Sequence, residues 1–334
     1  VKARVKAHAL KEFMNTKEKV VVMGHRLPDA DSFGAAIGIY RAAKTLNKKA
    51  YIVIDNPTSS IIPLMNTFSD NQDYEADMFV NNHEAKEIMD DNTLLVVVDT
   101  NKPSITQCED LLYMAKMIVV LDHHRQGSDT IRNSVLSYIE PYASSASEMV
   151  AEILQYFTEG IRIRNVEADS IYAGIMIDTD NFMQKTGVRT FEAAAFLRRC
   201  GADVTRVRKL FREDMNDYKA RGETIRNAEL FRGQFAISEC PSDYVDSPTV
   251  VGAQAANELL NIVGVKASFV LTEYKGVIYI SARAIDEVNV QIIMERMGGG
   301  GHLNMAGCQL EPVDLEGARS LLKSTLTEMQ DGGE

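Results

Sequence analysis

The sequence has few cysteines, and its four are scattered with no C-x-x-C pair among them. This spacing suits a reducing cytosol, in which cysteine serves as a small core residue. No apolar run approaches the ~20 residues needed to span a bilayer, and no signal peptide is visible. We therefore expect a cytoplasmic location and no membrane contact from this segment.

Positive charge is also scarce, with 36 Lys and Arg against 47 Asp and Glu and a formal net charge of −11. An acidic chain has no general attraction for long nucleic acid, so that class of partner is not expected. A small anion can still bind through metal ions or a local basic pocket. A chain of 334 residues is long enough for two domains. Because it begins with Val1, we expect it to be part of a longer protein.

The first half of the chain alternates between short apolar runs and helical patterns. Strands are predicted over residues 20–23, 50–54, 93–98, 117–120 and 171–177. Helices are predicted from near Ser32 to about Leu46, with Ser32 as the N-cap, and over 144–157. This alternation indicates an α/β fold with a mainly parallel, doubly wound sheet.

A second alternation follows a charged helical stretch. It predicts a strand over 230–238, a helix over 250–263, a hairpin of 267–273 and 277–284 around Lys275-Gly276, and a last helix from about Leu315. The predicted domains are a catalytic domain (1–211), a helical linker (212–226) and a smaller α/β substrate domain (227–334).

Metal-competent side chains follow four of the predicted strands. They are His25, Asp29 and Asp31 after the first strand, Asp99 after the third, Asp122, His123 and His124 after the fourth, and Asp178 after the fifth. The carboxyl ends of parallel strands converge on one crevice, so these side chains are expected to meet. Mixed imidazole and carboxylate ligands suit Mn²⁺, Fe²⁺, Co²⁺ or Zn²⁺. So many carboxylates suggest two ions sharing one bridging acid, as in displacement at phosphorus.

These motifs resemble those of the DHH phosphoesterase superfamily, whose name is the Asp122-His123-His124 triplet. G-H-x-x-P-D-x-D at 24–31, V-V-D-T at 97–100 and G-I-x-I-D-T at 174–179 match its other signatures. The glycine run 298–301 with His302 resembles the signature of the DHH-associated substrate domain. Segments 140–148 and 186–191 make the chain similar to the cyclic-di-AMP phosphodiesterases of Firmicutes, whose full-length forms are membrane-anchored.

The resemblance implies a set of six metal ligands. One ion would be held by His25, Asp29 and Asp99, and the other by Asp31, Asp99, His123 and Asp178, with Asp99 as the bridge. Asp122 and His124 would orient the ligands, and His124 would also stabilise charge on the phosphate. The expected catalytic residues are thus Asp99, Asp122 and His124. The expected cofactors are two divalent ions, with Mn²⁺ preferred.

Substrate contacts are expected from glycine and basic residues. The glycine run is open to two interpretations, because it could be a flexible turn or a nest of backbone N–H groups for a phosphate. The candidates for substrate binding are Arg125, Arg189, Arg283, Gly299, Gly300, Gly301, His302 and Asn304.

The function that the resemblance implies is metal-dependent hydrolysis of cyclic-di-AMP to linear 5′-pApA. The enzyme is expected to be a homodimer, and this chain is expected to be the soluble cytoplasmic part of a membrane-anchored protein. The alternative is a nano-RNase-like phosphodiesterase for short oligonucleotides or linear dinucleotides, which shares every metal motif. The acidic charge disfavours a RecJ-like exonuclease. The glycine-rich signature disfavours a family II pyrophosphatase. A non-catalytic sensor would need lost metal ligands, and none is lost.

Overall fold

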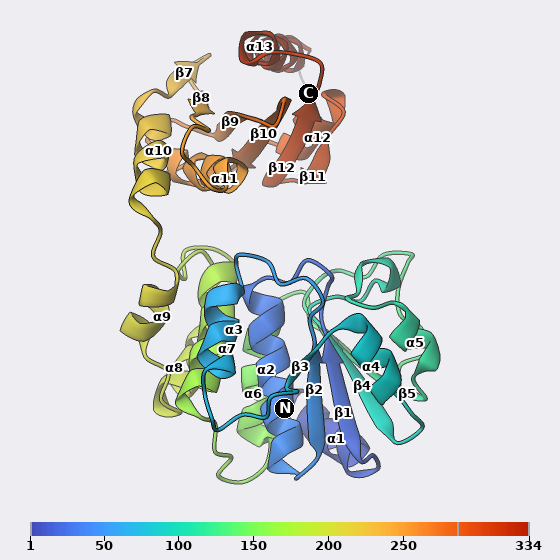
Figure 1. The fold of residues 1–334 in the computed structure, drawn as a ribbon. Helices are drawn as coiled ribbons and strands as arrows, with labels where there is room; N and C mark the ends of the chain where they lie inside the picture. Colours follow the sequence, from blue (N-terminus) through green and yellow to red (C-terminus); the bar gives the residue numbers. More distant parts are fainter. Residues whose placement is uncertain (1, 286, 333–334) are drawn as a thin grey trace. The chain divides into compact units, whose positions relative to one another are not determined.

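The chain forms two compact units in a computed structural model that describes residues 2–285 and 287–332 (Figure 1). The first unit runs to Arg212 and the second begins at Glu213. Each unit has its own sheet and its own hydrophobic clusters. Among the helices described, none is long and apolar enough to cross a membrane.

A sheet of six parallel strands, in the order β3-β2-β1-β4-β5-β6, forms the centre of the first unit. The strands are β1 Lys19–Met23, β2 Lys49–Val53, β3 Phe79–Val80, β4 Thr93–Val98, β5 Met117–Asp122 and β6 Leu136–Ile139. Val20 and Val22 enter one hydrophobic cluster while Val21 and Met23 enter another, so the sheet is buried on both faces. The predicted parallel α/β fold is confirmed, although the short strands β3 and β6 were not predicted.

Helices cover both faces of this sheet (Figure 1). One face carries α2 Ala30–Thr45, α6 Ala146–Phe157 and α7 Asn165–Asp178. The other carries α4 Asn82–Ile88 and α5 Asp110–Met114. The unit is completed by α1 Lys2–Asn15, α3 Ile62–Ser69, the 3₁₀ turn η1 Pro103–Ile105, α8 Val188–Arg199 and α9 Val204–Leu210.

The structure corrects two of these predictions. Residues 171–177 are not a strand but the last two turns of α7. An apolar run of that length cannot be assigned by periodicity alone, and α7 is buried continuously from Glu167 to Met176 because helices surround it. Helix α2 begins at Ala30, so its N-cap is Asp29, whose carboxylate accepts a hydrogen bond from the backbone N–H of Ser32 at 2.9 Å.

Glycines let α2, α6 and α7 approach closely. A Cβ placed on Gly34 would lie 2.5 Å from the carbonyl oxygen of Ser170, and one on Gly174 would lie 2.1 Å from Oγ of Ser147. Only residues without a side chain fit at these contacts. The close approach brings the first turn of α2 beside the N-terminus of α6, where Asp31 binds it.

The second unit contains a mixed sheet in the order β11-β12-β10-β9-β8-β7. Its strands are β7 Glu229–Phe231, β8 Phe235–Cys240, β9 Ala267–Tyr274, β10 Val277–Ala284, β11 Gly300–His302 and β12 Met305–Leu310, and its helices are α10 Met215–Arg226, α11 Pro248–Leu259, α12 Val290–Arg296 and α13 Leu315–Asp331. The predicted hairpin is confirmed, with Lys275 and Gly276 at φ values of 51° and 79° as its turn requires.

Two boundaries in this unit differ from the predictions. The predicted strand 230–238 is a hairpin of β7 and β8, which turns at Arg232 and Gly233 with φ values of 49° and 74°. Most of the predicted linker is helix α10, whose Ala220 is buried in a cluster with α11 and β8. Residues from Glu213 onward therefore belong to the second unit rather than to a separate linker.

Candidate metal centre

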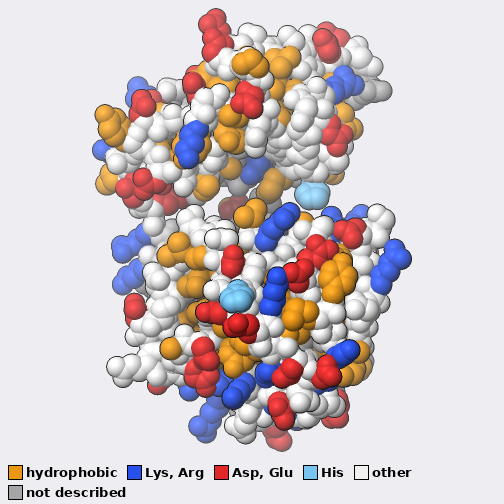
Figure 2. Space-filling view, turned by 45° about the vertical axis from the view of Figure 1, so that its right-hand side comes forward, with side chains coloured by type: hydrophobic (Ala, Val, Ile, Leu, Met, Phe, Trp, Pro, Cys, Tyr) orange, Lys and Arg blue, Asp and Glu red, His pale blue; other side chains and the backbone are white. Residues whose placement is uncertain are grey.

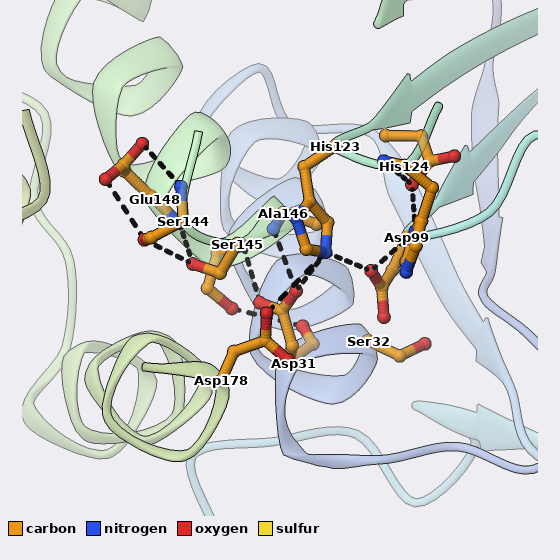
Figure 3. Close-up of polar contacts among 12 residues, drawn as sticks. Asp31, Ser32, Asp99, His123, His124, Ser144, Ser145, Ala146, Glu148 and Asp178 are labelled. Atoms are coloured by element: carbon orange, nitrogen blue, oxygen red, sulfur yellow. Dashed lines mark hydrogen bonds and ion pairs between the residues drawn. The ribbon is translucent and has the colours of Figure 1, made fainter. Parts of the chain in front are cut away.

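The predicted metal ligands come together at the carboxyl edge of the first unit's sheet. Figure 3 shows four of them, Asp31, Asp99, His123 and Asp178. His25 follows β1, Asp99 follows β4 and His123 follows β5. Asp29 and Asp31 lie at the start of α2, and Asp178 is the last residue of α7. Strand ends and helix ends thus contribute to one cluster. Figure 2 shows one face of the molecule, on which acidic side chains gather beside a histidine.

Asp99 occupies the centre of the cluster. It is buried, and its φ of 60° turns the chain sharply at the end of β4. Left-handed backbone is uncommon for residues other than glycine and is best tolerated by Asp and Asn, so this strained position is consistent with a functional role. Its Oδ2 lies 3.2 Å from Nε2 of His25, and its Oδ1 lies 3.2 Å from Nε2 of His123. Each carboxylate oxygen therefore faces a different histidine.

Three overlapping groups of side chains have ligand atoms within 4.8 Å of one another. The first contains His25, Asp29 and Asp99, and the second contains Asp31, His123 and Asp178. The third joins Asp99 and His123 to His124, so Asp99 belongs to two groups. Together, these groups contain every residue of the predicted ligand set.

The chemistry of the cluster fits a cation. Oδ1 of Asp99 and Oδ2 of Asp178 are buried without a hydrogen bond, and Nε2 of His123 is their shared neighbour, at 3.2 and 3.7 Å. A buried carboxylate oxygen is costly unless a hydrogen bond, an ion pair or a metal compensates it. Four carboxylates and three imidazoles without a thiolate make an oxygen- and nitrogen-rich set that suits Mn²⁺ and similar ions.

The pKa values show how strongly these charges interact. Burial, with the charges of Asp99 and Asp178, raises the pKa of Asp31, and burial raises that of Asp178 to about 6. Burial lowers the pKa of His25, but hydrogen bonds and attraction from Asp29 and Asp99 outweigh it and raise the value to about 10. When no metal ion is bound, bound protons therefore neutralise part of the negative charge of the carboxylates.

Backbone N–H groups hold Asp31 in place. Its Oδ2 accepts from the N–H of Ala146 and its Oδ1 from that of Ser147, both at 2.8 Å. These groups belong to the first turn of α6, which favours a negative charge. The N-cap of this helix is Ser145, which accepts from the N–H of Glu148 at 3.0 Å. Sequence reasoning placed Asp31 among the ligands but missed its support, because that support uses no side chain.

Asp122 and His124 form a hydrogen-bonded pair beside the cluster. Nδ1 of His124 lies 2.7 Å from Oδ1 of Asp122, and this hydrogen bond raises the pKa of His124. The other oxygen, Oδ2, accepts from Nδ2 of Asn101 at 2.5 Å. Asn101 is almost fully buried and was not singled out from the sequence. Its position two residues after Asp99, at the same strand end, was the signal that could have identified it.

The predicted arginine contacts of this unit differ in their surroundings. Arg125 is exposed in the loop after β5. Arg189, on α8, pairs with both oxygens of Glu152, at 2.9 and 3.0 Å, and lies 3.9 Å from Glu140. Its guanidinium is therefore already engaged by carboxylates. Of the two arginines, Arg125 therefore has the guanidinium that is freer to bind an anionic substrate.

In the second unit, strand register brings two predicted substrate residues into one row. Arg283 on β10 pairs with Met305 on β12, which pairs with His302 on β11. Asn304 is exposed in the turn between β11 and β12.

Half of the glycine run lies in a strand, because Gly300 and Gly301 belong to β11. Gly298 ends α12 with a φ of 83°. A Cβ on Gly299 would lie 2.1 Å from the carbonyl oxygen of Gly307, and one on Gly301 would lie 2.5 Å from Cα of Ala306. The structure thus explains why glycine is needed at three of the four positions. Gly300 has no such structural reason, because a Cβ there would meet nothing within 4 Å.

Comparisons with known proteins agree with this geometry. The N-terminal domain of the DHH family matches residues 19–175, and the DHHA1 domain matches residues 235–328. The chain is 43% identical to the cyclic-di-AMP phosphodiesterase GdpP of Bacillus subtilis over its whole length, which spans about half (51%) of that protein. It is 26% identical to the bifunctional oligoribonuclease and PAP phosphatase NrnA of Thermus thermophilus, over 95% of this chain and 91% of that one.

The fold is shared more widely than the sequence. An exopolyphosphatase-related protein from Bacteroides fragilis superposes with a TM-score of 0.82 at 19% identity, over 98% of this chain and 97% of that one. At that identity the likeness concerns the fold alone. The two domain matches show that this chain carries the N-terminal domain of the DHH family followed by a DHHA1 domain.

Proposed function

We propose that this chain is the catalytic part of a phosphodiesterase that uses two divalent ions, with Mn²⁺ preferred, to hydrolyse cyclic-di-AMP to linear 5′-pApA. The observation that carries the proposal is Asp99, whose two oxygens face His25 and His123 from the middle of the cluster. The choice of substrate is supported by the identity with a named cyclic-di-AMP phosphodiesterase across the whole chain.

His25, Asp29 and Asp99 would hold one ion, and Asp31, His123 and Asp178 the other. Asp99 would bridge the two ions, because its Oδ1 lies 3.2 Å from Nε2 of His123. Two such ions supply electrostatic stabilisation of the reacting phosphate and make the attacking water more acidic. The protein contributes orientation, because α6 fixes Asp31 and the strained turn at the end of β4 fixes Asp99.

His124 is assigned to the phosphate itself. Oδ1 of Asp122 holds Nδ1 of His124 and also accepts from the backbone N–H of His124, which leaves Nε2 free to donate a hydrogen bond to a phosphate oxygen. The side chain of His124 is 55% exposed, so a substrate can reach it. The bond to Asp122 favours the protonated imidazole, which stabilises negative charge better than the neutral form.

The test is product analysis by chromatography after incubation with Mn²⁺ and, separately, cyclic-di-AMP, cyclic-di-GMP and 5′-pApA. We expect cyclic-di-AMP to be opened to 5′-pApA, and 5′-pApA to be cut only slowly. The Asp99→Asn variant serves as the matched control, because it keeps the size and the backbone preference of Asp99. Faster cleavage of 5′-pApA than of the cyclic form would favour the oligonucleotide phosphodiesterase, and no cleavage by the fully metal-loaded protein would refute both.

The second unit is proposed to bind substrate rather than to perform chemistry. If His302 holds a phosphate in the ground and transition states alike, His302→Ala raises KM and leaves kcat nearly intact. Metal content should not change, because His302 is outside the three ligand groups. Steady-state kinetics with metal analysis of the same preparation measures both. Loss of an ion would place His302 among the ligands, and unchanged kinetics would exclude it from substrate binding.

The intact protein is proposed to be longer than this chain, to be anchored in a membrane and to act as a homodimer. The support is that the chain spans about half of the curated relative it matches at 43% identity. Membrane fractionation of the full-length protein tests whether it is anchored in a membrane. Analytical sedimentation of this chain tests whether it forms a dimer.

A further inference from the structure

Helix α6 begins with a buried glutamate that has no charged partner bonded to it. Glu148 is only 1% exposed and is the third residue of the helix. Among residues 2–285 and 287–332, no Lys, Arg or His forms an ion pair with it. The guanidinium of Arg189 pairs with Glu152 instead. A carboxylate is costly to bury in this way unless hydrogen bonds compensate it, so its hydrogen bonds indicate its role.

Both oxygens of Glu148 accept hydrogen bonds from one residue, Ser144. Oε2 accepts from the backbone N–H of Ser144 at 3.2 Å, and Oε1 accepts from its hydroxyl at 3.1 Å. In the other direction, the backbone N–H of Glu148 donates to Oγ of Ser145 at 3.0 Å. These bonds close the turn from Ser144 to Glu148 from both ends, in the manner of a capping box. The backbone between the two residues is therefore held in one conformation.

The closed turn presents two backbone N–H groups to Asp31. Ala146 and Ser147 lie inside the turn, and their N–H groups donate to the two oxygens of Asp31, both at 2.8 Å (Figure 3). The hydroxyl of Ser147 also donates to the carbonyl oxygen of Asp31 at 3.1 Å. Amides of a first helical turn have no acceptor within the helix, so the turn alone sets their direction. Because Oδ2 of Asp31 lies 3.6 Å from Nε2 of His123, a rotation of this carboxylate would alter the cation site between them.

The neighbouring helix α7 offers a comparison, because it carries a buried glutamate at the same position. Glu167 is the third residue of α7, and its two oxygens accept from Nε and Nη2 of Arg41, both at 2.7 Å. Asp178 is the last residue of the same helix and lies about 16 Å away along its axis. The ion pair explains why Glu167 is buried. Glu148 has no such pair, and its hydrogen bonds lead to a predicted metal ligand instead.

We propose that Glu148 is a positioning residue for the ion of the second ligand group, which contains Asp31, His123 and Asp178. By closing the turn, Glu148 directs two N–H groups at Asp31 and so fixes the carboxylate in the orientation that binds the ion. Among the hydrogen bonds of the described residues, none joins α6 to the first ligand group, so the other ion does not depend on Glu148. The two ions rest on the proposed function, but the hold of the turn on Asp31 can be tested without metal.

The experiment is calorimetric titration of this chain and its variants with Mn²⁺. Glu148→Met keeps the length of the side chain and removes both acceptors. The affinity for one ion should fall by about 10- to 100-fold, the scale of losing an outer partner of a metal ligand, and the affinity for the other should stay nearly unchanged. Glu148→Gln should keep both affinities, because an amide can accept from the N–H of Ser144 and donate to its hydroxyl. The matched control is Glu167→Gln, which weakens the pair with Arg41 and should lower the melting temperature without changing either affinity.

A milder variant and a metal-free measurement complete the test. Ser144→Ala removes only the hydroxyl donor, so the same ion should be weakened to a smaller extent. In the metal-free Glu148→Met protein, the amides of Ala146 and Ser147 should exchange with solvent about tenfold faster by NMR, as expected for the loss of about one hydrogen bond.

Equal weakening of both ions, unchanged affinities and exchange, or the same loss in Glu167→Gln would overturn the role of Glu148. Two bound ions without any cleavage would refute the proposed function and leave this role standing. Fewer than two ions on the unmodified chain would refute the two-ion mechanism, and amide exchange alone would then decide whether Glu148 holds the turn.

Discussion

The two units build their sites in opposite ways. The metal-competent cluster of the first unit gathers charged side chains at the ends of buried strands and helices, where Asp31 and Asp99 are almost fully buried. The predicted substrate residues of the second unit lie instead on neighbouring strands and in a turn of its sheet, where Arg283 is half-buried and His302 and Asn304 are exposed. Buried charge concentrates electrostatic interactions, whereas an open face offers shape and hydrogen bonds. We therefore expect changes in the first unit to affect chemistry and changes in the second to affect recognition.

The sharpest test of the first half of this comparison is Asp99→Ala. Because both oxygens of Asp99 face histidines, the change removes a ligand from two groups at once. We expect turnover to fall by at least about 10³-fold, the scale of removing a main electrostatic stabiliser. Steady-state kinetics with metal analysis measures the effect.

Asp180→Asn is the control for that variant. Asp180 is an acid two residues beyond Asp178, and asparagine tolerates its φ of 47°. It belongs to none of the three ligand groups, so turnover should stay near normal. An Asp99→Ala protein with a normal rate and two bound ions would show that Asp99 does not bridge.

The second test concerns the protons that occupy the cluster. The pKa of His25 is raised to about 10, so this imidazole is protonated at neutral pH and must lose a proton to bind a metal. Apparent Mn²⁺ affinity should therefore fall as pH is lowered, by about tenfold per pH unit for each proton displaced. Below pH 6 the slope should steepen, because Asp178, with a pKa of about 6, then also carries a proton.

Calorimetric titration with Mn²⁺ between pH 5 and 8 checks this dependence. His25→Gln is the informative control, because it removes the titrating imidazole and should flatten the slope at some cost in affinity. An affinity independent of pH in the unmodified chain would mean that protons and metal do not compete at this cluster. That result would also weaken the contrast between a charged, buried site and an open one.

The sequence allowed the first site to be predicted more fully than the second, for a physical reason. Every ligand of the first site follows directly on a strand or flanks a helix, so a list of polar residues at element ends was enough to find it. Even the error over residues 171–177 did no harm, because a helix and a strand can both end at the same edge and deliver Asp178 there.

The second site depends on register, which the sequence does not reveal. Arg283 and His302 were both named from the sequence, but their shared row appears only once β12 is known to pair with β10 and β11.

Asn101→Leu tests a residue that belongs to the first site without being a ligand. Losing its amide removes the hydrogen bond that holds Oδ2 of Asp122, and with it the orientation of His124. Partners of this kind affect activity by about 10- to 100-fold. We expect kcat to fall by that amount while KM and metal content stay near normal. Gln107→Leu is the control, a buried amide on the same segment that bonds Asn82 instead. Equal losses in both variants would mean that the effect is general destabilisation.

The smallest expected effect separates two neighbouring glycines of the second unit. Gly299→Ala places a methyl group 2.1 Å from the carbonyl oxygen of Gly307, so β12 must shift, and overpacking of this kind costs about 1–3 kcal/mol. Gly300→Ala meets no atom within 4 Å and should leave the melting temperature nearly unchanged. Thermal unfolding of both variants, beside nucleotide binding at a temperature where both are folded, gives the comparison. If the second unit recognises substrate over bare backbone, Gly300→Ala should weaken binding without loss of stability, and Gly299→Ala should lose stability first. Equal stability in the two variants would show that the close contact of β11 with β12 is not what requires glycine at position 299.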